Sequence, residues 1–181
     1  MTNTFLTLFD TALGRCGIAW GDNGILSASF AEDSDDRTRA HLRRRAKDAV
    51  ETDAVPAEIA TVIADIRALM AGASKDLMQA RLDLRDLGAF ETELYALTRA
   101  IGPGETRTYG DLARALGDVA LSQRVGQSLG RNPFPIIVPC HRVVGAGGAM
   151  TGFSAPGGIE TKRQLLKIEG AIGPDLIDLM V

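Results

Sequence analysis

The sequence predicts an α+β protein that combines a small antiparallel sheet with a mainly helical C-terminal part. Short apolar runs separated by glycine-containing turns occupy residues 1–30, a pattern typical of strands. Beyond them, apolar residues recur at helical spacing in residues 56–72 and 90–130. Because the pattern changes between these two regions, we expect two domains, at residues 1–86 and 87–181.

The N-terminal strands are expected at residues 4–9, 16–20 and 25–30. Gly14 marks the first turn and the run Gly21-Asp22-Asn23-Gly24 marks the second, which predicts an antiparallel meander. Residues 33–53 are rich in charge and predict a solvated helix face. Residues 79–84 are expected to form a returning strand.

Two regions of helix follow from the spacing of apolar residues. Pro56 suits a first helical turn and Gly72 a C-terminal cap, and the apolar face between them comprises Ile59, Ile63, Ile66 and Met70. A second helix carries Phe90, Leu94, Leu97 and Ile101 on one face. Thr108 and Asp111 are spaced to cap a third helix, and Gly117 separates it from a fourth at residues 121–130. Two short helices joined by so tight a turn predict a helix-turn-helix.

The helix expected at residues 121–130 carries a row of small residues. Ser122, Gly126 and Gly130 are spaced i, i+4, i+8. Glycine inside a helix costs about 1 kcal/mol relative to alanine, so this row indicates that something approaches the backbone closely. Two alternatives are open: tight packing against another helix, or docking against a DNA groove.

Composition limits the class of protein. The apolar fraction is 45% and the charged fraction 24%, both ordinary for a globular chain, and no apolar run reaches the ~18 residues of a membrane span. Residues 1–10 lack the features of a secretory signal. Two cysteines, Cys16 and Cys140, cannot build a disulfide framework, which favours a cytoplasmic location. Net charge is −3, but basic residues outnumber acidic ones in residues 105–167.

Cys140 is the candidate nucleophile. It follows the apolar run Ile136-Ile137-Val138 and precedes His141 and a glycine-rich loop. A lone buried cysteine is more often a small hydrophobe, but a thiol with a lowered pKa beside a histidine can act as a nucleophile. Adjacent side chains on an extended chain point to opposite sides, so His141 would need a bend or a bridging water to reach the sulfur.

The motifs around Cys140 resemble those of the O6-alkylguanine-DNA alkyltransferases. Pro139-Cys140-His141-Arg142-Val143 matches the active-site signature of that family, and Asn132-Pro133 precedes it at the expected spacing. The run from Thr108 to Ala113 matches the opening of the family's helix-turn-helix, and Lys162 to Gly170 matches its C-terminal helix. The resemblance is strong over residues 90–170 and looser at residues 10–20. It implies a ribonuclease-H-like N-terminal domain and a winged helix-turn-helix C-terminal domain.

The resemblance also implies a mechanism. Cys140 would take the alkyl group from O6 of guanine, or to a lesser extent O4 of thymine, in a single turnover without any cofactor. His141 would deprotonate the thiol through a water, and Glu169 would orient His141. Asn132 would hold the active-site loop, and Tyr109 would donate a hydrogen bond to the departing guanine.

The binding residues implied by the resemblance surround this centre. Val138, Phe153 and Ser154 would shape the base pocket, and the implied DNA contacts come from Ser122, Gln123, Arg124, Gly126 and Arg131. The target base would be flipped out of the duplex. The implied partner is double-stranded DNA carrying O6-alkylguanine, bound by a monomer.

The sequence departs from the family pattern at several points. Gln123 stands where the family usually has the arginine that fills the duplex, with Arg124 beside it. Phe153 stands where many members have tyrosine, and the loop at residues 154–158 is about two residues longer than in some relatives. Some members hold zinc in the N-terminal domain, but Cys16 and His41 are too few to form such a site, so we expect no metal.

Three other functions are compatible with parts of the sequence. One is a protein of the same fold that recognises alkylated bases without repairing them, although such relatives lack the cysteine. A second is a hydrolase or another thiol enzyme built on Cys140 and His141, which would turn over and need no DNA. A third is a transcription regulator using the helix-turn-helix.

Overall fold

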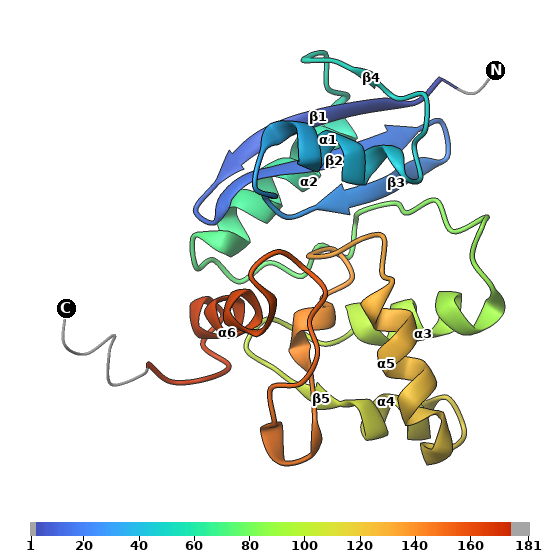
Figure 1. Ribbon diagram of the computed structural model, residues 1–181, viewed down its shortest axis with the longest axis vertical. Coiled ribbons are helices and arrows are strands. Elements are labelled where there is room, and N and C mark those ends of the chain that lie inside the picture. The colour runs from blue at the N-terminus through green and yellow to red at the C-terminus, as the bar shows by residue number, and fades with distance from the viewer. Residues whose placement is uncertain (1–2, 175–181) are drawn as a thin grey trace.

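The computed structural model describes residues 3–174 as an α+β structure in which a sheet with two helices lies against a group of further helices (Figure 1). The elements are β1 (Phe5–Thr11), β2 (Gly14–Gly21), β3 (Gly24–Ser29), α1 (Asp35–Arg43), β4 (Val50–Glu51), α2 (Ala57–Met70), α3 (Ala89–Arg99), β5 (Arg107–Thr108), α4 (Tyr109–Ala115), η1 (Val119–Leu121), α5 (Ser122–Gly130), η2 (Cys140–Arg142), β6 (Val143–Val144), η3 (Ala146–Gly148) and α6 (Gly158–Ile168). The ends of the two expected domains, residues 1–2 and 175–181, lie outside the described residues. None of the described helices has the length and apolarity needed to cross a membrane.

The sheet has the strand order β3-β2-β1-β4. β1, β2 and β3 form the predicted antiparallel meander, which is confirmed. β4 adds a parallel strand that the sequence did not predict, pairing Phe5 with Val50 and Leu6 with Glu51. Two residues are too short to show the alternation by which a strand is recognised in a sequence.

Each face of the sheet is covered by one helix, because successive side chains of a strand point to opposite faces. Cys16, Ile18 and Trp20 pack in one cluster with the apolar face of α2, which comprises Ile59, Ile63, Ile66 and Met70 as predicted. Leu6, Leu8, Ala19 and Leu26 pack on the other face with Leu42 of α1. α1 is the charged helix expected within residues 33–53, and α2 begins directly after Pro56 rather than with it.

The strand predicted at residues 79–84 is wrong. Leu82 forms only an isolated parallel bridge with Ile25, flanked by hydrogen bonds from Ile25 to Arg81 and from Asp83 to Ile25. The Arg45 guanidinium donates to the carbonyl oxygens of Leu26 and Asp83 and so ties this segment to β3. The segment therefore covers the edge of β3 without extending the sheet.

The helices of the C-terminal part follow the sequence pattern closely. Thr108 and Asp111 form the predicted capping box at the start of α4. α4 and α5 contact each other and are joined by the short 3-10 helix η1, so the predicted pair of adjacent helices is confirmed. Gly117, which follows the C-cap residue Leu116, has a φ of +111°, a left-handed conformation that favours glycine just after a helix.

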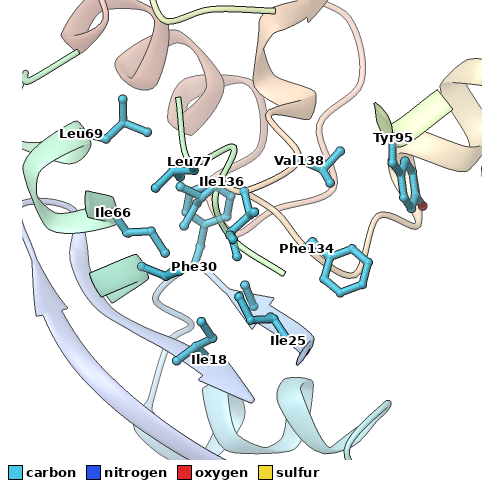
Figure 2. Close-up of a cluster of buried hydrophobic side chains, with 14 of the residues drawn as sticks. Ile18, Ile25, Phe30, Ile66, Leu69, Leu77, Tyr95, Phe134, Ile136 and Val138 are labelled. Carbon is cyan, nitrogen blue, oxygen red and sulfur yellow. The ribbon is translucent and has the colours of Figure 1, made fainter. Parts of the chain in front are cut away.

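One hydrophobic cluster joins the sheet to the helices (Figure 2). It includes Ile18, Ile25 and Phe30 from the sheet region and Phe134 and Ile136 from the segment that leads to Cys140. The backbone of this segment also bonds to the sheet, since the Ala28 amide donates to the Pro133 carbonyl oxygen. The sheet therefore anchors the chain just before the candidate nucleophile. The division into domains at residue 86 stays a prediction.

Candidate active site

Cys140 lines a cavity of about 690 Å³ beside α5. The other lining residues come from α4, α5 and the loop before α6: Tyr109, Ser122, Gln123, Gly126, Gln127, Leu129, Gly130, Thr151, Gly152, Phe153 and Ser154. The volume suits a small molecule or one nucleobase with its sugar. We call this space the reaction cavity.

The row of small residues on α5 faces the reaction cavity. Ser122, Gly126 and Gly130 all line it. A Cβ built at Gly126 would lie 3.8 Å from the Tyr109 ring, an ordinary contact, and one at Gly130 would meet nothing within 4 Å. The Tyr109 ring of α4 thus contacts the row at Gly126 without crowding it, and both alternatives, packing against a helix and docking against a DNA groove, stay predictions.

Asn132 clamps the loop that carries Cys140. Its Nδ2 donates to the Val138 carbonyl oxygen at 2.9 Å, and its Oδ1 accepts from the Phe134 amide at 2.9 Å. The loop includes Ile136 with a φ of +76°, an unfavourable conformation for a β-branched residue. Such strain persists only where surrounding contacts hold it, and here Ile136 is buried in the core.

A buried triad of polar side chains, His141, Arg142 and Glu169, adjoins Cys140 in the chain and in the fold. Oε1 of Glu169 lies 2.8 Å from Nε2 of His141, and both oxygens of Glu169 accept from Arg142 at 2.9 Å. A third nitrogen of Arg142 donates to the Ile101 carbonyl oxygen at 2.6 Å. The three side chains are almost fully excluded from solvent.

The protonation of the triad follows from its contacts. Burial alone would raise the pKa of Glu169, but hydrogen bonds from His141 and Arg142 outweigh it and hold the pKa at about 2. An ionised carboxylate can only accept, so Nε2 of His141 carries the hydrogen and Nδ1 is the basic nitrogen. Burial lowers the pKa of His141, so the ring is neutral near pH 7. Nδ1 is buried and has no hydrogen-bond partner among residues 3–174.

The Cys140 thiol does not have the lowered pKa that is typical of an activated cysteine. Burial raises its pKa, and this effect is opposed by the Asn132 amide, the charge of Lys162 and the backbone amides of Cys140 and His141. The thiol therefore stays protonated at rest and needs a base when it reacts. Residues 140–142 form the 3-10 turn η2, which provides the bend that an extended chain would lack.

Lys162 belongs to the site, although the sequence indicated it only as part of the motif of the last helix. It is fully buried, and its Nζ donates to the carbonyl oxygens of Val143 and Thr151. It also lies over the rings of Tyr109 and Phe153, at 5.7 and 6.0 Å from their centroids. Lys162, Leu165, Leu166 and Glu169 are spaced i, i+3, i+4, i+7, so the helical period could have placed both charges on the buried face of α6.

The structure separates Gln123 from Arg124. Gln123 lines the reaction cavity, whereas the Arg124 guanidinium stacks over the Phe90 ring of α3 at 3.8 Å from its centroid. The other predicted binding residues also differ in position. Tyr109 and Phe153 line the cavity, and the Ser154 hydroxyl donates to the Gly130 carbonyl oxygen at 2.7 Å.

Besides Arg124, two other predicted binding residues lie away from the reaction cavity. Val138 is fully buried and contributes its carbonyl oxygen to the Asn132 clamp. Arg131 lines a neighbouring cleft instead.

Tyr109 keeps its proton, because burial raises its pKa, and its hydroxyl donates a long 3.4 Å hydrogen bond to the Thr151 carbonyl oxygen.

The C-terminal half of the chain is similar in sequence to known proteins. The family of the 6-O-methylguanine DNA methyltransferase DNA-binding domain matches residues 89–171. A methylated-DNA–protein-cysteine methyltransferase of Methanosarcina acetivorans is 45% identical over 82 residues, which cover 45% of this chain and 51% of that relative. The chain thus matches such curated relatives over about half of their length.

Solved structures match over nearly the whole chain. A crystal structure of Mycobacterium tuberculosis O6-methylguanine methyltransferase has a TM-score of 0.73 at 29% identity, covering 98% of this chain and 99% of the other. A structure from the same organism in complex with DNA has a TM-score of 0.72 at 29% identity and covers 91% and 92% of the two chains. These comparisons show that residues 89–171 are similar to the 6-O-methylguanine DNA methyltransferase DNA-binding domain, and that the fold is similar to that of solved O6-methylguanine methyltransferases.

Proposed function

We propose that this protein repairs DNA by moving an alkyl group from O6 of guanine, and less often from O4 of thymine, onto its own Cys140. The observation that carries the proposal is a thiol that lines an open cavity and adjoins a buried Glu169–His141 pair. The names of the matched relatives support the same activity.

The transfer is a single displacement. The Cys140 sulfur attacks the alkyl carbon, the carbon–O6 bond breaks, and its electron pair leaves with the guanine. Nδ1 of His141 receives the thiol proton through a water, while Glu169 fixes the ring by accepting from Nε2. Tyr109, which is protonated and loosely bonded, donates to the departing base.

The product explains why each molecule would act once. Transfer leaves a thioether on Cys140, and neither water nor guanine readily displaces a thiolate from carbon. The reaction needs no cofactor, because the damaged base is the alkyl donor.

The DNA partner is expected to lie along α5. The base would be extruded into the reaction cavity at a cost of a few kcal/mol, and Gly126 and Gly130 leave room for the groove to approach. Phosphate contacts should dominate, so binding should weaken as salt rises. The ribonuclease-H-like and winged helix-turn-helix assignments, the monomeric state and the cytoplasmic location belong to the same proposal.

The intact mass of the protein tests this function. After incubation with a duplex containing O6-methylguanine, the wild type should gain one methyl group and stop at one equivalent. Cys140→Ala should gain none, and the matched control Cys16→Ala should gain one, because Cys16 is buried in β2. Tighter binding to damaged duplex without any mass gain would instead indicate a lesion-recognition protein. Turnover without DNA would indicate another thiol enzyme.

Gln123→Arg should strengthen DNA binding or accelerate repair. Gln123 lines the reaction cavity, and an arginine there would add a cation and a longer side chain toward the space vacated by the base. We expect roughly two- to fivefold tighter binding to a damaged duplex, the scale of one partly screened charge. Titration at two salt concentrations measures it. If neither affinity nor rate rises, Arg124 or another residue already fills this role.

A further inference from the structure

Phe153 is an aromatic wall of the reaction cavity. It lies in the loop before α6, between Gly152 and Ser154, and all three residues line the cavity together with Cys140. A flat ring beside the nucleophile suits a nucleobase, because every base has a π-face on which an aromatic side chain can stack. The position of this ring therefore bears on how tightly a flipped guanine is held.

The backbone of Phe153 does little to orient its ring. Hydrogen bonds tie the loop on either side, where the Thr151 carbonyl oxygen accepts from Lys162 and the Ser154 hydroxyl donates to Gly130. Within the described residues 3–174, however, the amide and carbonyl of Phe153 itself make no hydrogen bond. The orientation of the Phe153 ring thus depends on what the ring touches.

Phe30, at the end of the sheet, makes such a contact. It directly follows β3, and its ring meets the Phe153 ring edge to face, with centroids 6.0 Å apart and planes at 66°. Aromatic rings favour this arrangement, which contributes more than the area that it buries. The Lys162 Nζ lies 6.0 Å from the centroid of the same ring, so Phe153 has partners in both the sheet region and α6.

The end of β3 also holds the segment that leads to the nucleophile. The amide of Ala28, two residues before Phe30, donates to the Pro133 carbonyl oxygen at 2.9 Å. Pro133 directly follows Asn132, whose side chain clamps the loop that carries Cys140. One short stretch of the N-terminal sheet therefore contacts both the nucleophile's segment and, through Phe30, the aromatic wall of the reaction cavity.

We propose that Phe30 is a positioning residue for the damaged base: it orients Phe153 and thereby sets part of the affinity for a flipped guanine. Phe30 does not line the reaction cavity, so it acts through Phe153 and not by touching the base. The inference rests on the proposed alkyl transfer and adds to it a part for the N-terminal sheet in recognising damage.

Phe9 provides a matched control for the loss of a buried ring. Phe9 and Phe30 are each 4% exposed, and both belong to the hydrophobic cluster that joins the sheet to the helices. The Phe9 ring also has one partner, the Arg67 guanidinium at 5.7 Å, but it lines neither cavity that Cys140 lines. Leucine at either position removes a buried ring, so the two variants should lose similar stability.

The test measures affinity for duplexes with and without O6-methylguanine, in a Cys140→Ala background that prevents transfer. Phe30→Leu should weaken binding to the damaged duplex about two- to tenfold, the scale of one aromatic pair, and leave binding to the undamaged duplex unchanged. Phe9→Leu should change neither affinity. Phe30→Met, which fills a similar volume without a ring, should repeat the Phe30→Leu result and serves if that variant folds poorly.

A double-mutant cycle tests whether Phe30 acts through Phe153. Phe153→Leu alone should weaken binding to the damaged duplex, and adding Phe30→Leu should cause little further loss, because the ring to be oriented is already absent. With Cys140 present, Phe30→Leu should raise the duplex concentration that gives half-maximal transfer and change the maximal single-turnover rate much less. A role in folding alone would not produce this split.

The outcomes separate this inference from the proposed function. Unchanged affinity for the damaged duplex in Phe30→Leu, or equal losses for damaged and undamaged duplexes, would overturn the proposal and leave the repair function intact. The same loss in Phe9→Leu, or additive losses in the Phe30 and Phe153 double variant, would overturn it as well. Absence of methyl transfer in the wild type would refute the repair function itself.

Discussion

Replacing Glu169 with alanine should lower the free energy of unfolding by about 3–5 kcal/mol, because it leaves Arg142 buried and unpaired beside His141. The rate of alkyl transfer should fall on the order of 100-fold, because His141 loses the contact that fixes its proton on Nε2. Denaturant unfolding measures the first effect, and single-turnover rates at low temperature, where the variant is folded, measure the second.

Glu169→Gln is the matched control, since it keeps the size of the side chain and removes its charge. It should also remove the pH dependence of stability that Glu169 causes. The pKa of Glu169 is held at about 2, below the ordinary value of 4.5. Its contribution to the free energy of unfolding, about 3 kcal/mol, is therefore present above pH 4.5 and is lost as the pH falls toward 2. A Glu169→Ala variant as stable as the wild type at pH 7 would contradict the view that the triad is a structural unit.

Replacing Lys162 with methionine should slow alkyl transfer about tenfold, the effect of losing about 1.4 kcal/mol of transition-state stabilisation, while changing stability much less. The charge of Lys162 lowers the pKa of Cys140, so its removal disfavours the thiolate that attacks. Methionine fills a similar volume, and removing a buried ammonium avoids its desolvation cost, which offsets the loss of two hydrogen bonds to carbonyl oxygens.

The pH dependence of Cys140 alkylation by iodoacetamide measures this effect. The reaction should move to higher pH in Lys162→Met. Lys47→Met is a suitable control, because Lys47 is an exposed lysine that lines neither of the two cavities that Cys140 lines. If the iodoacetamide profile and the transfer rate match the wild type, Lys162 is only a structural tie between the two loops.

The predictions for Glu169 and Lys162 concern charged side chains that matter because they are buried. The Cys140-His141 motif was visible in the sequence because neighbouring residues carry it. Arg142 and Lys162 stood in the same motifs, but charged residues are usually exposed, and only packing revealed them as fully buried. Glu169 was expected to orient His141, whereas its double contact with Arg142 could not be read from residues 27 positions apart.

The local structure was largely determined by the sequence. The meander, the apolar face of α2, and the capping box of Thr108 and Asp111 depend on spacing within a few residues, and all are confirmed. The segment 79–84 was misjudged, because strand pairing requires a partner at the right distance. Here Arg45 and a single bridge to Ile25 tie the segment to β3 without a ladder.

By itself, the sequence determined the meander, the main helices and their buried faces, and it indicated the candidate nucleophile with its neighbouring histidine. Only the tertiary structure decided that Gln123 faces the reaction cavity while Arg124 stacks on Phe90, and that the Phe30 ring meets the Phe153 ring of that cavity. The physical reason is that the spacing of apolar residues shows which side of one helix or strand is buried, whereas a cavity forms between several helices, strands and loops. Its shape and charge therefore depend on how residues distant in the sequence pack together.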